Sequence, residues 1–247
     1  MQEVRDLFNF ENLKAVIFDL DGTLLDTLGG IASSMNRVLR SHSFPTHELG
    51  NYEYLAGDGL HKLVERALPE EVGTGPNIED YIAEFRRDYL ANWRKETDLF
   101  PGMDALLDAL VARGVKLSVL SNKPEELTRI CVGEYFSKWH FEAVLGDDGK
   151  RAKKPNPEGV LEISQSLGIP LSDFIFVGDT SIDMNTASAG GVFAVGVSWG
   201  FRKTEELKDS GADLIVDSPE ELVGRIGSNL KKPRDAELGQ IQETGVI

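Results

Sequence analysis

Short apolar runs that alternate with helical periodicity constrain the fold of this chain more than any other feature of its sequence. Most of these runs are apolar throughout, as strands buried on both faces of a sheet must be. Stretches with apolar residues at i, i+3, i+4 and i+7 separate them and predict helices. Such alternation predicts a parallel sheet covered by helices. The expected strands are residues 15–18, 115–120, 143–145, 174–177, 193–197 and 214–216.

The alternation stops between residues 27 and 96, where three helical stripes occur without an obvious strand. An all-helical insertion between the first and second strands is therefore expected. The expected fold is α/β, with a doubly wound, mostly parallel (Rossmann-like) sheet core and an inserted all-helical cap domain. The expected units are a core of residues 1–26 and 97–230, a cap of residues 27–96 and a polar C-terminal tail of residues 231–247.

Two acidic clusters follow expected strands. Asp19 and Asp21 follow the first strand, and Asp179 and Asp183 follow the strand at 174–177. Open parallel sheets place ligands at this end of their strands. Burying carboxylates so close together is costly unless a cation or a shared proton relieves their repulsion. Four acidic groups at adjacent strand ends suit a hard divalent cation with oxygen ligands, and Mg²⁺ is the expected cofactor.

Polar and basic residues follow two other strands. Ser121 and Asn122 end the second strand and offer a hydroxyl group and backbone donors to phosphate oxygens. Lys154 lies on the loop after the third strand, where its ammonium group could neutralise a phosphate oxygen. Taken singly, each piece is more often a turn, a helix cap or a connector. Four pieces in fixed order, each beyond a strand of one sheet, favour an active site.

Together these motifs resemble those of the haloacid dehalogenase-like superfamily, in its phosphoglycolate phosphatase-type branch. The resemblance covers nearly the whole chain and rests on residues 19–23, Ser121, Lys154 and residues 178–183. It implies a magnesium-dependent phosphatase that hydrolyses a phosphomonoester of a small metabolite through a phospho-aspartate intermediate. The implied substrate is 2-phosphoglycolate.

The resemblance also implies a role for each motif residue. Asp19 is the expected nucleophile and Asp21 the expected general acid and base. Asp183 is expected to support Lys154 and the metal ligands. The expected metal ligands are Asp19, Asp179 and, through its carbonyl group, Asp21. The expected substrate-binding residues of the core are Thr23, which orients the loop, Ser121, Asn122 and Lys154.

A glycine-containing turn marks the expected cap. Gly57, Asp58 and Gly59 precede the helical stripe that begins at Leu60. A flexible turn that leads into a helix N-terminus could close over a reaction centre, although a simple turn between helices would look the same. Phosphoglycolate phosphatases carry a similar segment, so all three residues are included among those expected to bind substrate.

Charge and composition narrow the expected partners and location. The net charge is −15, from 41 acidic and 26 basic residues, and this argues against a nucleic acid partner. No segment approaches the ~18 apolar residues of a membrane span. Cys131 is the only cysteine, and the N-terminal segment is acidic without a long apolar run, which favours a cytoplasmic location. The expected partner is a small phosphorylated metabolite, and the oligomeric state is not predicted.

Other functions share parts of this pattern. A dehalogenase does not need a metal, and a phosphonate hydrolase has a small residue where Asp21 stands, so the acidic residues argue against both. A β-phosphoglucomutase-like phosphomutase or a pyrophosphatase would keep all four motifs, and these alternatives stay open. The alternative of another class is a non-catalytic phosphate-binding regulatory protein. The presence of both Asp19 and Asp21 argues against it.

Overall fold

Six parallel strands form the central sheet of this structure, a computed structural model that describes residues 8–227. The strands are β1 Ala15–Phe18, β4 Lys116–Pro124, β5 Phe141–Asp147, β6 Phe174–Gly178, β7 Phe193–Val197 and β8 Leu214–Val216. They lie in the order β5-β4-β1-β6-β7-β8, and all neighbours run parallel. Each corresponds to an expected apolar run, so the predicted α/β fold is confirmed.

The strand order reverses at β1, in the middle of the sheet. From β1 the chain adds β4 and β5 on one side, and it then returns to add β6, β7 and β8 on the other. Doubly wound sheets bind ligands in the crevice beyond the carboxyl ends of the strands at such a reversal. Phe18 pairs with Val119 of β4 and with Val177 of β6. The residues just beyond these positions therefore reach the same edge of the sheet.

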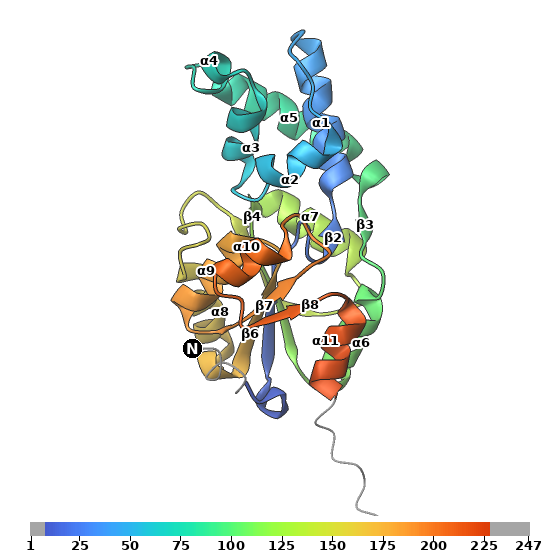
Figure 1. Cartoon of the computed structure of the whole chain (residues 1–247), viewed down its shortest axis with the longest axis vertical. Coiled ribbons are helices and arrows are strands. Elements are labelled where there is room, and N and C mark those ends of the chain that lie inside the picture. Colours follow the sequence, from blue (N-terminus) through green and yellow to red (C-terminus); the bar gives the residue numbers. More distant parts are fainter. Residues whose placement is uncertain (1–7, 228–247) are drawn as a thin grey trace, which may run out of the picture.

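Helices cover both faces of the sheet (Figure 1). They are α6 Met103–Ala112, α7 Glu125–Tyr135, α8 Glu158–Leu167, α9 Ser181–Gly190, α10 Thr204–Asp209 and α11 Pro219–Gly227. Val16 and Phe18 of β1 pack in the hydrophobic cluster that includes α6, α7 and α11. Ala15 and Ile17 pack in the cluster that includes α8, α9 and α10. Because successive side chains of a strand point to opposite faces, burial of both faces explains why the whole β1 run is apolar.

A second group of α-helices lies between β1 and β4 in the chain and beyond the carboxyl edge of the sheet (Figure 1). These helices are α1 Leu28–Ser41, α2 Tyr52–Leu55, α3 Leu60–Ala67, α4 Glu70–Gly73 and α5 Ile78–Asn92. Their packing buries Tyr52, Tyr89 and Trp93 almost completely. We call residues 27–96 the cap. The all-helical insertion is present, while its standing as a separate domain remains a prediction.

A short antiparallel ribbon joins the cap to the core. Strand β2 Leu25–Asp26 pairs with β3 Asp98–Leu99, and both run between the two groups of helices (Figure 1). The sequence did not predict these strands, because two residues are too few to show a periodicity of two. The ribbon lies at the residues where the cap was expected to begin and end.

The remaining elements are short 3-10 helices: η1 Phe10–Asn12, η2 Leu49–Asn51, η3 Trp93–Glu96 and η4 Leu171–Asp173. Residues 1–7 and 228–230 of the expected core and the whole expected tail, 231–247, lie outside the described residues. Within residues 8–227, no helix is both long enough and apolar enough to cross a lipid bilayer.

Candidate active site

Asp19 stands at the carboxyl end of β1, where the strand order reverses. Its backbone N–H donates to the carbonyl group of Val177 at 2.9 Å, which continues the pairing of β1 with β6. Its side chain is buried, and Lys154 Nζ lies 2.8 Å from Asp19 Oδ1. A buried carboxylate at the sheet edge, paired with an ammonium group, suits a nucleophile that attacks an anionic substrate.

The chain turns sharply at Gly22. This residue has a φ of +85°, in the left-handed region that favours glycine. A Cβ atom at this position would also overlap the carboxylate of Asp179. Glycine is therefore required here for two reasons, the backbone conformation and the close approach of the two acidic segments.

Three buried carboxylates meet beside this turn. Asp19, Asp179 and Asp183 each offer an oxygen atom, and these atoms lie within 4.8 Å of one another. Asp179 accepts hydrogen bonds from Thr23 Oγ1 and from the backbone N–H of Phe201, each at 2.8 Å. The two donors fix the orientation of the Asp179 carboxylate within the cluster.

Asp183 links the first turn of α9 to Lys154. Its Oδ2 accepts hydrogen bonds from the backbone N–H and the hydroxyl group of Thr180, at 3.0 and 2.7 Å, in a capping box. Its Oδ1 accepts a hydrogen bond from Lys154 Nζ at 2.7 Å. Asp183 thus lies where the sequence placed it, beside the lysine that contacts Asp19, and its functional role remains a prediction.

The cluster holds more negative charge than Lys154 neutralises. Burial raises the pKa of Asp19 to about 6, although Lys154 opposes the shift. Burial, with the nearby carboxylates of Asp183 and Asp19, also raises the pKa of Asp179 well above its ordinary value. Burial works to lower the pKa of Lys154, but the carboxylates of Asp183 and Asp19 raise it above its ordinary value. A bound cation would relieve the remaining repulsion.

The donor set of the cluster fits a divalent metal ion. All its ligand atoms are oxygens, which hard cations such as Mg²⁺ prefer. Asp19 and Asp179, two of the three expected ligands, are both members. The carboxylate of Asp21, the third, is not a member, and only its carbonyl oxygen was expected to bind the metal. The buried repulsion among the carboxylates is the observation that makes a cation favourable here.

Lys123 is a functional candidate that the sequence did not single out. Its Nζ donates to Asp21 Oδ1 and Oδ2 at 2.8 and 3.1 Å, and to the Tyr89 hydroxyl group at 2.9 Å. Burial works to lower the pKa of Lys123, but the Asp21 carboxylate and its other neighbours raise it well above its ordinary value. The only signal in the sequence is its place two residues after Ser121, since Asp21 is 102 residues away.

Asn122 fastens the Lys154 loop to the end of β4. Its Oδ1 accepts a hydrogen bond from the Lys154 backbone N–H at 2.9 Å, and its Nδ2 donates to the Lys154 carbonyl group at 3.1 Å. The same Nδ2 donates to the carbonyl group of Gly57 in the cap at 3.4 Å. Ser121 is buried beside it, and its oxygen accepts a hydrogen bond from the backbone N–H of Lys123 at 3.3 Å. The hydroxyl hydrogen of Ser121 is then available to a substrate oxygen.

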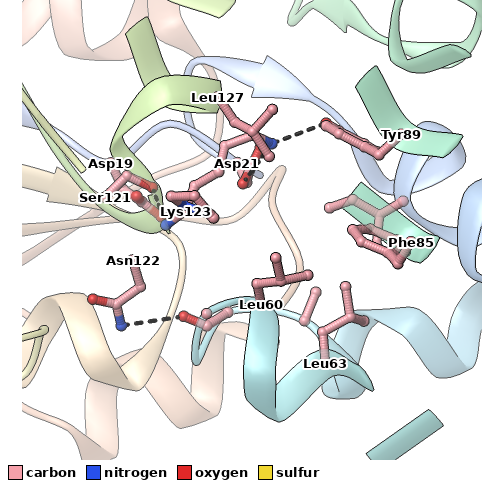
Figure 2. A pocket seen from close by; sticks show the side chains of 15 residues that line it. Asp19, Asp21, Leu60, Leu63, Phe85, Tyr89, Ser121, Asn122, Lys123 and Leu127 are labelled. Carbon is pink, nitrogen blue, oxygen red and sulfur yellow. Dashed lines mark hydrogen bonds and ion pairs between the residues drawn. The ribbon is translucent and has the colours of Figure 1, made fainter. Parts of the chain in front are cut away.

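A pocket of about 540 Å³, including space open to solvent, lies between the core and the cap (Figure 2). Its polar side chains on the core side are Asp19, Asp21, Ser121, Asn122 and Lys123. Its apolar side chains from the cap are Ile31, Ala56, Leu60, Leu63 and Phe85. Tyr89 adds the hydroxyl group that contacts Lys123. A phosphate group at Asp19 would therefore leave its organic part facing the cap.

Two residues that were expected to bind substrate lie differently. Thr23 is fully buried and donates its hydroxyl to Asp179, so it orients a carboxylate instead of facing the pocket. Asp58 forms an ion pair with Arg66 of α3 and does not line the pocket, whereas its neighbours Gly57 and Gly59 do. We assign neither Thr23 nor Asp58 to substrate contact, because the protein already uses both side chains.

Known proteins share both the sequence and the fold of this chain. The family model for haloacid dehalogenase-like hydrolases matches residues 16–197. A phosphoglycolate phosphatase of Salmonella paratyphi A is 31% identical over 236 residues, which cover 88% of this chain and 94% of the relative. A crystal structure of a protein from Lactobacillus delbrueckii subsp. bulgaricus superposes on this structure with a TM-score of 0.80. The two sequences are 30% identical, and the match covers 86% of this chain and 98% of that chain.

A haloacid dehalogenase-like family protein of Streptococcus pneumoniae extends the likeness at lower identity. It is 22% identical, has a TM-score of 0.77, and covers 87% of this chain and 98% of that chain. At this identity the likeness concerns the fold alone. The fold is therefore shared well beyond the relatives that resemble this sequence closely.

Proposed function

Because this chain belongs to the haloacid dehalogenase-like hydrolase family and is a phosphatase, we propose that it hydrolyses a small phosphomonoester with Mg²⁺ through a phospho-aspartate at Asp19. The observation that carries the proposal is the meeting of Asp19, Asp179 and Lys154 in one buried cluster at the pocket. This arrangement supports the proposal that a nucleophile, a metal ion and a phosphate-neutralising cation act on one phosphate group.

The first step transfers the phosphoryl group to the protein. The Asp19 carboxylate attacks phosphorus in line, and the bond from phosphorus to the leaving oxygen breaks. Lys154 neutralises charge on the phosphate oxygens, and the Ser121 hydroxyl group donates a hydrogen bond to them. Asp21 gives its proton to the leaving oxygen, which departs as an alcohol.

The second step restores Asp19. Asp21, now a carboxylate, takes a proton from the water molecule that attacks the phosphorus of phospho-Asp19, and inorganic phosphate leaves. Asp19, Asp179 and the carbonyl oxygen of Asp21 would hold Mg²⁺. When bound, Mg²⁺ supplies positive charge that offsets the negative charge of the carboxylates and the phosphate oxygens.

We propose 2-phosphoglycolate as the substrate within this class. The Salmonella relative is named a phosphoglycolate phosphatase. Among the described residues that line the pocket, Lys123 is the only cation, and it lies between Asp21 and the cap residue Tyr89. The ammonium group is already paired with the Asp21 carboxylate, and the mostly apolar cap side of the pocket supports a short leaving group.

The pocket gives less support to the competing functions. A sugar phosphomutase must bind several hydroxyl groups, and the mostly apolar cap side offers few partners for them. A pyrophosphatase must bind a second phosphate group, and one lysine neutralises little of the negative charge that this group adds.

The cytoplasmic location and the lack of a nucleic acid partner remain predictions from composition.

Phosphate release by wild-type protein and two variants tests the function. Wild-type protein is expected to release inorganic phosphate from 2-phosphoglycolate with Mg²⁺ and to lose this activity in excess EDTA. Asp19→Asn is expected to lower kcat by more than about 10³-fold with the fold intact, because an amide is a poor nucleophile. Asp26→Asn changes an exposed aspartate of the same segment and is the matched control. Turnover at the wild-type rate in Asp19→Asn would contradict the nucleophile assignment.

A substrate panel separates the remaining alternatives. The same assay with pyrophosphate and with β-glucose 1-phosphate is expected to give lower kcat/KM values than 2-phosphoglycolate does. Isomerisation of β-glucose 1-phosphate to glucose 6-phosphate without net phosphate release would indicate a mutase. Phosphate binding without turnover of any ester would indicate the non-catalytic alternative.

A further inference from the structure

A buried lysine joins the cap to the Asp21 carboxylate. Lys123 Nζ lies 2.8 and 3.1 Å from the two carboxylate oxygens of Asp21, and 2.9 Å from the hydroxyl oxygen of Tyr89. An ammonium group has three N–H donors, and these contacts account for all of them. Nζ also lies 4.7 Å from the centroid of the Tyr89 ring, within the range of a cation–π interaction.

The three residues come from separate parts of the fold. Tyr89 belongs to α5 of the cap, Lys123 to β4, and Asp21 to the turn after β1. In Figure 2, Tyr89 faces the pocket from one side, while Asp19 and Ser121 lie on the other side. Tyr89 is 1% exposed, and the side chain of Lys123 is 5% exposed. Neither can move far without breaking its packing.

Asp21 depends on this link for its orientation. Among the described residues, Lys123 is the only side chain that pairs with the Asp21 carboxylate. Asp21 therefore differs from Asp179, which is fixed by two donors from the core, and from Asp183, which is fixed by three. Contacts with both parts of the protein fix the Lys123 side chain: Asp21 belongs to the core and Tyr89 to the cap.

We propose that Tyr89 is a positioning residue, which orients Asp21 through Lys123 and so makes proton transfer to the leaving group depend on the cap. The inference rests on the proposed phosphatase function, in which Asp21 protonates the leaving oxygen. When α5 lies against the site, the Tyr89 hydroxyl fixes one donor of Lys123, and the other two hold Asp21. Without that hydroxyl, Lys123 keeps its ion pair but gains freedom, and Asp21 moves with it.

The consequence depends on the leaving group. A strongly basic alkoxide needs a proton from Asp21 as the bond to phosphorus breaks, whereas p-nitrophenolate leaves readily without one. A misplaced Asp21 therefore slows alkyl phosphates more than p-nitrophenyl phosphate. A general loss of structure would slow both equally.

Steady-state kinetics with three esters test the inference. We would measure kcat/KM for p-nitrophenyl phosphate, phenyl phosphate and ethyl phosphate, because this constant reports the steps up to formation of phospho-Asp19. Tyr89→Phe removes the hydroxyl group and keeps the ring. It is expected to lower kcat/KM for ethyl phosphate about tenfold and that for p-nitrophenyl phosphate less than about threefold. Lys123→Met is expected to enlarge the same difference.

Tyr52→Phe is the matched control. Tyr52 is also a buried tyrosine of the cap, but its hydroxyl donates to Asn36 at 2.9 Å, away from the pocket. This variant is expected to keep the wild-type ratio between the esters. The ratio is taken within one preparation, so it does not depend on how much of the protein is folded.

Each outcome decides between two hypotheses. A steeper dependence on leaving-group basicity in Tyr89→Phe and Lys123→Met, but not in Tyr52→Phe, supports the inference. An equal loss for all three esters in Tyr89→Phe, or no loss, overturns it while the phosphatase function stands. Failure of wild-type protein to hydrolyse any ester would instead overturn the proposed function itself.

Discussion

At the scale of the residue, two adjacent lysines have opposite surroundings. Lys154 is buried and contacts Asp19 and Asp183, whereas Lys153 is 40% exposed and pairs with Asp147. The chain therefore carries its own control for the effect of removing one positive charge from this loop.

Lys154→Ala is expected to lower kcat/KM about 10²- to 10³-fold, because the phosphate oxygens lose a charge that matters most in the transition state. It should also lower the free energy of unfolding of the metal-free protein by about 3 kcal/mol, since two buried carboxylates lose their partner. Phosphate release and urea unfolding measure the two effects. Lys153→Ala should change kcat/KM less than about twofold, and an equal loss in both variants would remove Lys154 from the site.

The same scale shows what the sequence can predict about the site. Asp19, Ser121 and Asp179 could be expected near one another because each lies at the carboxyl end of a strand of one sheet, and the carboxyl ends of parallel strands meet. Tyr89 could not be expected there, because its partner Lys123 lies on another element and no local pattern joins them. Thr23 was expected to serve the substrate, but its orientation toward Asp179 depends on packing between distant segments.

At the scale of the element, the turn after β1 carries the heaviest constraint. Gly22 has a positive φ and leaves no room for a Cβ beside Asp179. Gly114 also has a positive φ, of +75°, but a Cβ there would meet open space. Alanine substitution at both glycines therefore separates the cost of the left-handed backbone conformation, which both variants share, from displacement of the Asp179 carboxylate, which occurs only at Gly22.

Gly22→Ala is expected to raise the Mg²⁺ concentration for half-maximal activity at least about tenfold, because the new methyl group displaces the Asp179 carboxylate. Both Gly22→Ala and Gly114→Ala should lose about 1 kcal/mol of stability from the left-handed backbone alone. A titration of activity with Mg²⁺ and thermal melts of each variant test this. Unchanged Mg²⁺ dependence in Gly22→Ala would contradict the placement of Asp179 among the metal ligands.

Strands were predictable as far as their residues are apolar. The strand β1 was predicted with its full extent, because residues on both its faces are buried and apolar. The end of β4 was missed by four residues, because its last residues are polar and serve the site. In α8, the apolar Leu161 is 47% exposed, whereas Val160 and Ile163 are buried. Periodicity indicates a helix without fixing its rotation against the sheet.

At the scale of the whole molecule, the acidic charge and the metal site are linked. A net charge of −15 repels anionic substrates, and the three buried carboxylates concentrate that charge at the site. The buried carboxylates therefore repel one another in the folded chain, and a bound cation or bound protons can relieve this repulsion. The stability of the folded chain should depend on both the metal ion and the pH.

The effect of Mg²⁺ on stability should depend on pH. The pKa of Asp19 is about 6 in the folded chain against an ordinary value of 3.8, and Asp179 shifts in the same direction. The folded state thus binds protons more tightly than the unfolded state, so Asp19 makes stability fall as pH rises from about 4 to about 6, and Asp179 also makes stability fall with rising pH. Mg²⁺ binds the deprotonated cluster and should offset this loss.

Thermal melts with Mg²⁺ and with EDTA, at about pH 5 and about pH 7.5, measure this coupling. The rise in Tm on adding Mg²⁺ should be larger at the higher pH, because protons compete with the metal ion at the lower one. Asp19→Asn removes one of the shifted carboxylates, so in EDTA at the higher pH it should melt above the wild-type protein. The exposed Asp26→Asn should leave the melting behaviour unchanged. An equal rise in Tm at both pH values would contradict binding of Mg²⁺ by the deprotonated buried carboxylates.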